Sequence, residues 1–506
     1  MTPGRVGRLA IATAIALATL ACSGTDASDG PDRTEGETTT TPPAPAGPTF
    51  ERGPCEVVVP GDRPVECGTV DVPVRHEQPD GPTLRLAVVV IRSTADDVAP
   101  DPVVYLHGGP GSGRLDQGFA AIGANRFLER RDLIFFDQRG TGRSTPDLNC
   151  PERELAFVAV LTRTLPFEDE LRLVGDAVAA CHDRLRADGV DLDAFDSVQN
   201  AQDLGVLREA LGVREWNLWG ASYGTRLALE ALRHHPEGVR SVILDSVYPT
   251  TAGGGDPVES GRRAFAALAA GCAADPVCDT ANPDVEATLE RAARAMDRQP
   301  YAFTWQRPDG PVELELGGDD LVGGLFNALY DTALVPLLPG AITSMSVGDR
   351  TLVPLVADTG IPFINDATEG AFFSVECADN AARMDRARID ELRREPGRAG
   401  LLMLSTWQPF CDRWPVDPLP ATFGEPVRSD VPALVVAGEY DPITPPADSR
   451  GAAEALGNAT FVQVPRGGHT PLFDTECTTE IALRFLERPG PVDTACMAGI
   501  EPQPFT

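Results

Sequence analysis

Lysine is absent from the 506 residues of this sequence, so all 43 basic side chains are arginines. Its absence excludes Schiff-base lysines, Ser-Lys dyads and the lysine of phosphate-binding loops. Basic charge is also scarce overall, because 75 acidic side chains leave a formal net charge of −32. An excess of acid this large repels nucleic-acid phosphates and anionic lipid headgroups, so we expect no general binding to either.

The N-terminus carries a short uncharged run. Leu9 to Ala21 follows two arginines and has thirteen residues, too few to cross a bilayer core of about 30 Å as a helix. It is typical of a signal peptide. Cys22 follows directly, and this junction resembles the bacterial lipobox. We therefore expect residues 1–22 to be a signal peptide with a lipid-anchored Cys22, or, as the alternative, a leader released from a secreted protein.

Residues 23–50 contain almost nothing apolar and consist mostly of Ser, Thr, Pro, Gly and Asp. Such a segment cannot bury enough surface to fold, so we expect a disordered linker. The remaining length exceeds what one hydrophobic core usually supports, which predicts a large domain with an insertion or two domains.

Ten cysteines remain besides Cys22, and none has the C-x-x-C spacing of a zinc or redox site. An even number in a chain that we expect to be exported predicts five disulfides. The sequence does not determine their connectivity. Pairing between neighbours along the chain closes short loops and is our prediction.

Short strands alternate with helices in two parts of the chain. The predicted strands are Leu84–Ile91, Pro102–Leu106, Asp132–Phe136, Trp216–Trp219, Val239–Asp245, Pro432–Ala437 and Thr460–Val464, and the two clearest helices are Gln199–Leu211 and Ser222–His234. This alternation predicts an α/β protein with a mostly parallel, doubly wound sheet. Helical stretches rich in Ala and Arg replace it between residues 251 and 425. We expect a largely helical cap insertion there, between core segments 51–250 and 426–506.

The strongest chemical motif is Gly220-Ala221-Ser222-Tyr223-Gly224, which lies between a predicted strand and a predicted helix. It matches the G-x-S-x-G turn that lifts a nucleophilic serine clear of a sheet. Glycines flank the serine because the strand and the helix pack too closely there for side chains. A helix-capping role for Ser222 is the alternative, and both roles are compatible.

A serine hydroxyl needs a base to accept its proton. The six histidines are His76, His107, His182, His234, His235 and His469. His234 and His235 end the helix that Ser222 begins, about three turns away. His469 follows the strand Thr460–Val464 in a loop near the end of the chain, where a base after a serine and an acid is expected. We therefore predict His469 as the base.

The third catalytic group must be a carboxylate that orients the imidazole. Asp441 follows the strand Pro432–Ala437 in Gly-Glu-Tyr-Asp-Pro and precedes His469. It is the predicted acid, with Glu439 as the local alternative. Asp-Pro is also a common turn pair, so a purely structural role for Asp441 is the other interpretation.

An oxyanion hole needs two backbone N–H groups. Tyr223, directly after the serine, should supply one. The second should come from His107-Gly108-Gly109-Pro110-Gly111, which follows the strand Pro102–Leu106. Proline has no N–H, so we choose Gly109 over Gly108 as the donor. His107 is then a loop organiser. Dinucleotide binding is disfavoured because the G-x-G-x-x-G spacing is absent from this turn.

Together, HGGPG at His107, DQRGTGRS at Asp137, GASYG around Ser222, GEYDPITP around Asp441 and GGHTP around His469 resemble the proline iminopeptidase and tripeptidyl aminopeptidase group of α/β-hydrolases. The resemblance implies an α/β-hydrolase fold and an exopeptidase that acts from a free N-terminus. It also implies that DQRGTGRS is a structural turn beside the active site, and we assign that turn no catalytic role.

In that group an acidic side chain of the cap binds the α-ammonium of the substrate, within a segment similar to Ser-Val-x-Cys-Ala-Glu. This chain has Ser374-Val375-Glu376-Cys377-Ala378-Asp379. The resemblance therefore implies Asp379, with its neighbour Glu376, as the substrate-binding acid. Asp is shorter than Glu, which changes its reach. A solvated residue at the start of a helix is the alternative interpretation of Asp379.

These residues predict an exported serine exopeptidase that removes one to three residues from peptides through an acyl-enzyme. No H-E-x-x-H motif is present, and we expect no metal and no cofactor. Two alternatives remain open. One is an esterase that uses the same triad, and the other is a lipoprotein that binds peptides on a disabled hydrolase fold.

Overall fold

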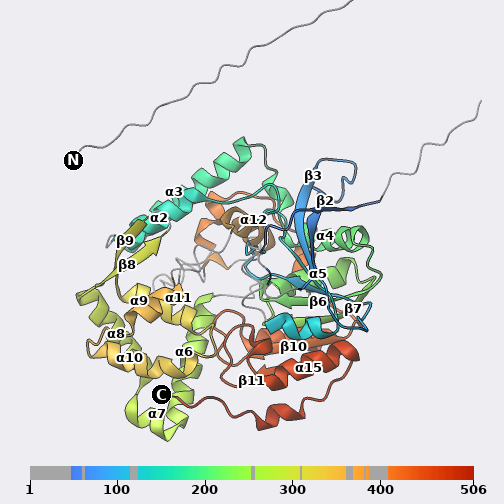
Figure 1. Ribbon diagram of the computed structural model, residues 1–506. Coiled ribbons are helices and arrows are strands. Elements are labelled where there is room, and N and C mark those ends of the chain that lie inside the picture. Colours follow the sequence, from blue (N-terminus) through green and yellow to red (C-terminus); the bar gives the residue numbers. More distant parts are fainter. Residues whose placement is uncertain are drawn as a thin grey trace, which may run out of the picture. The chain divides into compact units, whose positions relative to one another are not determined.

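The computed structural model describes residues 47–57, 59, 63–113, 115, 123–162, 165–251, 257–307, 310–360, 368–380, 383, 385–387, 391 and 408–505. The predicted signal peptide, Cys22 and almost all of the predicted linker lie outside these residues. The chain from Gly47 to Thr506 forms one compact unit (Figure 1). Within the described residues, no helix combines the length and the hydropathy that crossing a membrane requires.

A nine-stranded sheet forms the centre of this unit, in the order β1-β2-β3-β5-β4-β6-β7-β10-β11. The strands are β1 (Phe50–Gly53), β2 (Val65–Pro73), β3 (Thr83–Ile91), β4 (Val103–Leu106), β5 (Leu133–Phe136), β6 (Trp216–Ala221), β7 (Val239–Asp245), β10 (Ala433–Gly438) and β11 (Ala459–Val464). The pairs from β5 through β4, β6, β7 and β10 to β11 are all parallel. β1, β2 and β3 add an antiparallel edge. The mostly parallel sheet is confirmed.

Helices cover both faces of the sheet. Neighbouring strand residues point to opposite faces, and Leu218 and Trp219 of β6 belong to two different apolar clusters. The Leu218 cluster contains side chains of α3 (Phe167–Ala187), α4 (Ser197–Ala210), α5 (Tyr223–His234) and α14 (Pro446–Ala455). The Trp219 cluster contains side chains of η1 (Gly123–Glu129), η10 (Pro471–Phe473) and α15 (Glu476–Glu487). The predicted doubly wound arrangement is therefore confirmed.

Between β7 and β10 the described residues add no strand to this sheet. The longer elements of this segment, the insertion, are α6 (Pro257–Ala274), α7 (Pro276–Ala281), α8 (Val285–Arg298), β8 (Tyr301–Arg307), β9 (Gly310–Leu316), α9 (Gly318–Ala328), α10 (Leu338–Ser346), α11 (Val353–Gly360) and α12 (Glu369–Asn380). Helices α6 to α11 and strand β9 share an apolar core of their own. The domain boundaries at residues 250 and 425 stay predictions.

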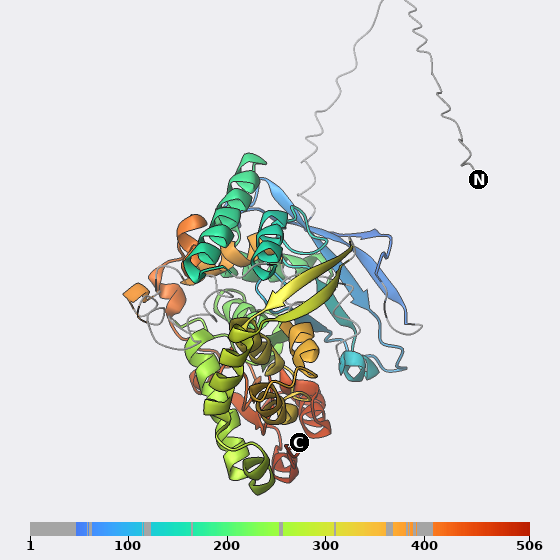
Figure 2. The same ribbon diagram turned by 90° about the vertical axis from the view of Figure 1, so that its left-hand side faces the viewer.

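A hairpin in this insertion, β8 with β9, was not predicted. Half-buried and exposed side chains alternate along Tyr301–Arg307, as they do in a strand with one covered face. The hairpin lies beside α2 (Pro151–Leu161) in both views (Figures 1 and 2), and Arg307 of β8 donates a hydrogen bond to Glu154 of α2 at 2.6 Å. The other short helices are η2 (Leu192–Ala194), η3 (Val335–Leu337), η8 (Gln408–Arg413), η9 (Ala421–Gly424) and η11 (Ala495–Gly499).

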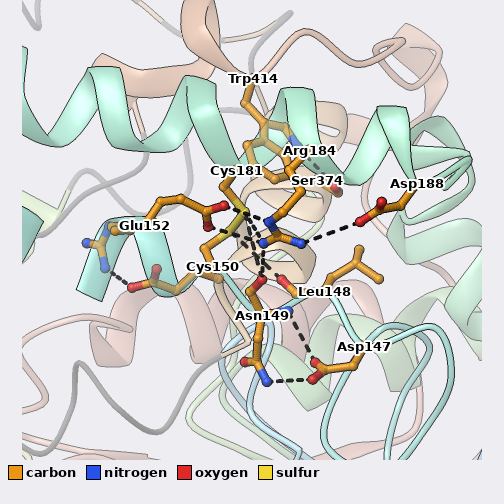
Figure 3. Close-up of a disulfide and its surroundings, with 12 residues drawn as sticks. Asp147, Leu148, Asn149, Cys150, Glu152, Cys181, Arg184, Asp188, Ser374 and Trp414 are labelled. Carbon is orange, nitrogen blue, oxygen red and sulfur yellow. Dashed lines mark hydrogen bonds and ion pairs between the residues drawn. A yellow bond between two sulfur atoms is a disulfide. The ribbon is translucent and has the colours of Figure 1, made fainter. Parts of the chain in front are cut away.

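Five disulfides join cysteines that are neighbours along the chain, as predicted. The pairs are Cys55–Cys67, Cys150–Cys181, Cys272–Cys278, Cys377–Cys411 and Cys477–Cys496. Cys150 precedes α2 and Cys181 lies in α3, so this bond fastens the two helices (Figure 3). Arg184 strengthens the same junction, because it donates hydrogen bonds to Glu152 at 2.6 Å and to the carbonyl of Asn149 at 2.7 Å (Figure 3).

Replacing both Cys150 and Cys181 by serine should lower the free energy of unfolding. The bond closes a loop of 31 residues, and the loss of that constraint on the unfolded chain costs about 3 to 4 kcal/mol. Urea unfolding followed by circular dichroism measures it. The double serine variant at Cys272 and Cys278 is the control, because its loop of six residues should cost only about 2 kcal/mol. Equal losses would contradict the chain-entropy argument.

Candidate active site

Ser222 lies in a strained turn between β6 and α5, with φ of 54° and ψ of −121°. Its N–H donates to the carbonyl of Asp245 at 2.9 Å. A Cβ on Gly220 would lie 2.4 Å from the carbonyl oxygen of Gly224, and a Cβ on Gly224 would lie 1.9 Å from that of Leu106. Both flanking glycines are therefore required by close packing, as expected. Ser222 occupies the N-cap position of α5, but its side chain makes no capping hydrogen bond there.

The predicted base and acid are in direct contact. His469 Nδ1 lies 2.8 Å from Asp441 Oδ2, and Asp441 is fully buried. Burial opposes the charge of Asp441, but His469 together with the N–H and hydroxyl of Thr444 outweighs it and lowers the pKa of this carboxyl. A carboxylate at Nδ1 leaves Nε2 of the imidazole to act as the base. Glu439 instead accepts the N–H of Arg466 at 2.8 Å.

Ser222, Asp441 and His469 follow the carboxyl ends of β6, β10 and β11, which lie at one edge of the sheet. The N–H of Tyr440 donates to the carbonyl of Gly467 at 2.8 Å and joins the loops of the acid and the histidine, and the N–H of Thr470 donates to Ser246 Oγ, directly after β7, at 2.9 Å. The structure thus brings the acid and the base together and places the serine at the end of β6, which β7 separates from β10. Transfer of the Ser222 proton to His469 stays a prediction.

The loop after β4 reaches the serine. A Cβ on Gly108 would lie 3.1 Å from Ser222 Cβ and 3.6 Å from its Oγ. Gly109 has φ of 111°, a backbone conformation that favours glycine. Gln138 donates to the carbonyl of His107 at 3.0 Å and so fixes the start of the loop. Burial lowers the pKa of His107 to about 4, which keeps this ring uncharged. The oxyanion donors Gly109 and Tyr223 stay predictions.

A family model described as the alpha/beta hydrolase fold matches residues 101–476 of this chain. The chain belongs to the α/β-hydrolase family. It is 27% identical over 464 residues to serine protease Hip1 of Mycobacterium tuberculosis. The matched stretch covers 79% of this chain and 81% of that protein. It is 27% identical over 456 residues to carboxylesterase B of the same organism, which covers 84% of each chain. Tripeptidyl aminopeptidase of Streptomyces lividans is 31% identical over 196 residues, 37% of this chain and 36% of that protein.

The DQRGTGRS segment of this α/β-hydrolase is a structural turn. Arg139 is fully buried and donates to both carboxylate oxygens of Asp203, at 2.8 and 2.5 Å. It also donates to the carbonyls of Val74 and Ala194. Arg139 therefore ties the turn after β5 to α4.

Sequence reasoning missed Thr444. Its hydroxyl donates to Asp441 Oδ2 at 2.7 Å and lies 3.1 Å from His469 Nδ1. Its N–H donates to Asp441 Oδ1 at 2.9 Å. Thr444 therefore orients the acid, and its two hydrogen bonds stabilise the charged carboxylate. The available signal was a hydroxyl residue three positions after the predicted acid, where a side chain can hydrogen-bond back across a turn.

Replacing Thr444 by valine removes this hydroxyl while keeping the shape of the side chain. We expect kcat to fall about tenfold or more, because Asp441 loses a buried hydrogen bond and holds the imidazole less firmly. The measurement is kcat and KM of the variant on any substrate that the native chain hydrolyses. Thr444→Ser keeps the hydroxyl and should restore most of kcat. An unchanged kcat in the valine variant would show that Thr444 does not orient Asp441.

The loop of the insertion that contains Tyr330 and Thr332 holds the loop of His469. Sequence reasoning also missed this contact. The N–H of His469 donates to the carbonyl of Tyr330 at 2.9 Å, and the N–H of Gly468 donates to Thr332 Oγ1 at 2.8 Å. The Thr332 hydroxyl in turn donates to Asp474. The Tyr330 ring lies edge-on to the His469 imidazole, with 4.8 Å between their centroids. The insertion thus holds the loop that carries the predicted base.

The two acids implied as substrate ligands are buried in a polar cluster between α12 and α5. Asp379 is fully buried in the last turn of α12, so the alternative of a solvated residue at a helix start is wrong. Its carboxylate accepts from the Ser197 hydroxyl at 2.5 Å and from Arg226 Nη1 at 3.1 Å. Glu376 accepts from the Tyr248 hydroxyl at 2.9 Å and from Asn380 at 2.7 Å.

This cluster is connected to the nucleophile turn. The Ser197 hydroxyl that reaches Asp379 also lies 2.9 Å from the hydroxyl of Tyr223, the residue after Ser222. The Arg226 guanidinium lies 3.6 Å over the Tyr248 ring. Arg226 interacts electrostatically with both carboxyl groups, and burial nevertheless raises the pKa of Asp379. Binding of a substrate ammonium by Asp379 or Glu376 stays a prediction.

The Glu376 carboxyl should make stability depend on pH. Burial raises its pKa to about 7 from an ordinary value of 4.5, against the opposing effect of Arg226. Between those values the folded chain keeps a proton that the unfolded chain has lost, so the free energy of unfolding falls as the pH rises through this window. Glu376→Gln should reduce that fall by about 2 kcal/mol, because the amide oxygen accepts the same hydrogen bonds without a charge.

Urea unfolding of both chains at pH 5 and pH 8 measures this effect. Glu315→Gln on β9 is the control, because that side chain is exposed and its replacement should leave the pH dependence unchanged. An equal fall in the native chain and in Glu376→Gln would show that Glu376 is ionised throughout.

Proposed function

We propose that this α/β-hydrolase is an exported serine exopeptidase that cleaves one to three residues from the free N-terminus of peptides. The contact between His469 Nδ1 and Asp441 Oδ2, at the sheet edge where Ser222 stands in its strained turn, carries the proposal. The likeness to serine protease Hip1 over most of both chains and to tripeptidyl aminopeptidase over a shorter stretch supports a peptidase. Five disulfides support an oxidising compartment.

In the proposed reaction, His469 Nε2 accepts the Ser222 proton as Oγ attacks the scissile carbonyl carbon. Asp441 stabilises the imidazolium that forms. The N–H groups of Gly109 and Tyr223 bind the negative oxygen of the tetrahedral intermediate. His469 then protonates the leaving amine, and a water molecule hydrolyses the acyl-enzyme by the same route.

Selection of a free N-terminus needs an acid at a fixed distance from Ser222. The cluster that contains Asp379 and Glu376 packs against the helix that begins after the serine, which suits that role. A peptide ammonium would gain a charge-assisted hydrogen bond there, whereas a blocked N-terminus would leave the acid without it.

An esterase is the second candidate. The likeness to carboxylesterase B, over 84% of each chain, favours it. Both activities need the same serine, base, acid and oxyanion donors, so only the substrate distinguishes them.

The deciding experiment compares free and N-acetylated Ala-Ala-Ala-p-nitroanilide and Pro-p-nitroanilide with p-nitrophenyl acetate. We expect cleavage of free anilides at a rate at least about a hundredfold above that of blocked ones, because the acid binds only a charged amine. Ser222→Ala should lower kcat by about 10⁴-fold or more. Equal cleavage of blocked substrates would overturn the exopeptidase, hydrolysis of the ester alone would establish an esterase, and a native chain that a fluorophosphonate does not label would indicate a binding protein.

A further inference from the structure

The insertion contains an apolar cavity of about 270 Å³ between the end of α9, helix α10 and helix α11. Each of its nine lining residues is aliphatic or glycine, so the walls offer no side chain that donates or accepts a hydrogen bond. For comparison, a dry engineered cavity of about 150 Å³ with similar walls binds benzene. The cavity can therefore accept a small aliphatic group, whereas a polar group would find no hydrogen-bonding side chain in its walls.

The mouth of this cavity is open to solvent. Leu337 and Leu355 line it, and they are 38% and 40% exposed. Further inside, Leu338 and Ala341 are buried in the core of the insertion. Large exposed aliphatic side chains around a concave apolar surface are typical of a binding site.

One wall of the cavity is connected to the loop that contains His469. Ala328 and Leu334 form one wall, and between them stand Tyr330 and Thr332, which bind the backbone of His469 and Gly468. α11 forms the other wall.

We infer that this cavity binds an aliphatic group of the substrate, which in a peptide is the side chain of a residue such as leucine. The inference rests on the proposed function, because it takes the group to belong to a peptide that Ser222 cleaves. The cavity selects by size and apolarity, whereas the buried acids select a charged N-terminus. One of its walls, formed by Ala328 and Leu334, flanks the loop whose Tyr330 carbonyl accepts the N–H of His469.

The test uses Ala-Ala-Ala-p-nitroanilide and the three anilides in which one alanine is replaced by leucine. Native protein should cleave at least one leucine substrate with kcat/KM about tenfold above that of the alanine substrate. Leu355→Asp places a charge at the mouth, on an exposed position that tolerates it, and should abolish this preference. Ala341→Phe fills the cavity from its buried side and should do the same.

Matched controls use the same replacements away from the cavity. Val347→Asp changes a residue of the insertion that is 81% exposed and does not line the cavity, and Ala273→Phe changes an exposed position on α6. Both should keep the leucine preference. A native chain that does not distinguish leucine from alanine at any position, or a preference that survives in Leu355→Asp, overturns the inference.

Failure of the proposed function gives a different result. If the native chain hydrolyses p-nitrophenyl acetate but none of the anilides, the exopeptidase is wrong. The cavity is then judged on p-nitrophenyl octanoate against the acetate. A ratio of their kcat/KM values that falls about tenfold in Leu355→Asp, and not in Val347→Asp, supports an aliphatic site, and an unchanged ratio overturns it.

Discussion

The hydrogen bond between Asp441 and His469 is the interaction on which the chemistry depends. A carboxylate in the interior is expensive unless its charge is matched, and this one is fully buried. The cost is offset by the imidazole and by the N–H and hydroxyl of Thr444. The same contacts fix which nitrogen of the ring is basic. The order of the parallel strands determines that the two loops meet, because β10 and β11 are neighbours.

The insertion supplies the second constraint. An α/β-hydrolase sheet alone places the nucleophile, base and acid at one edge. Here the carbonyl of Tyr330 and the hydroxyl of Thr332 accept the N–H groups of His469 and Gly468, so the position of the catalytic ring depends on a segment outside the sheet. A Cβ on Gly468 would lie 2.4 Å from the Tyr330 carbonyl oxygen, which makes glycine necessary where the insertion contacts this loop. A movement of the insertion would therefore change the position of His469.

Local patterns predicted what depends on local geometry. The turn around Ser222 has a sequence signature because strand and helix can approach there only through Gly220 and Gly224, and disulfides between neighbouring cysteines follow from short loops. Thr444 lies within three residues of Asp441 and could have been found. Tyr330 could not, because its contribution to His469 is a backbone carbonyl, which any residue could supply. The partner of Asp379 was equally hidden, since Arg226 looks like an ordinary residue of an amphipathic helix.

The buried cluster shows why the family alone does not determine the substrate. The resemblance assigned Asp379 to a substrate ammonium, yet in the folded chain Arg226 already faces that carboxylate at 3.1 Å. Glu376 carries no such ion pair: it accepts hydrogen bonds only from neutral partners, Tyr248 and Asn380, among its described contacts. Burial raises the pKa of both carboxyls, and the charge of Arg226 opposes that rise at each of them. The Asp379–Arg226 pair joins this cluster to the nucleophile helix, so the sequence resemblance alone does not determine how an ammonium group would be held there, and recognition of a free N-terminus by Asp379, with its neighbour Glu376, stays a prediction.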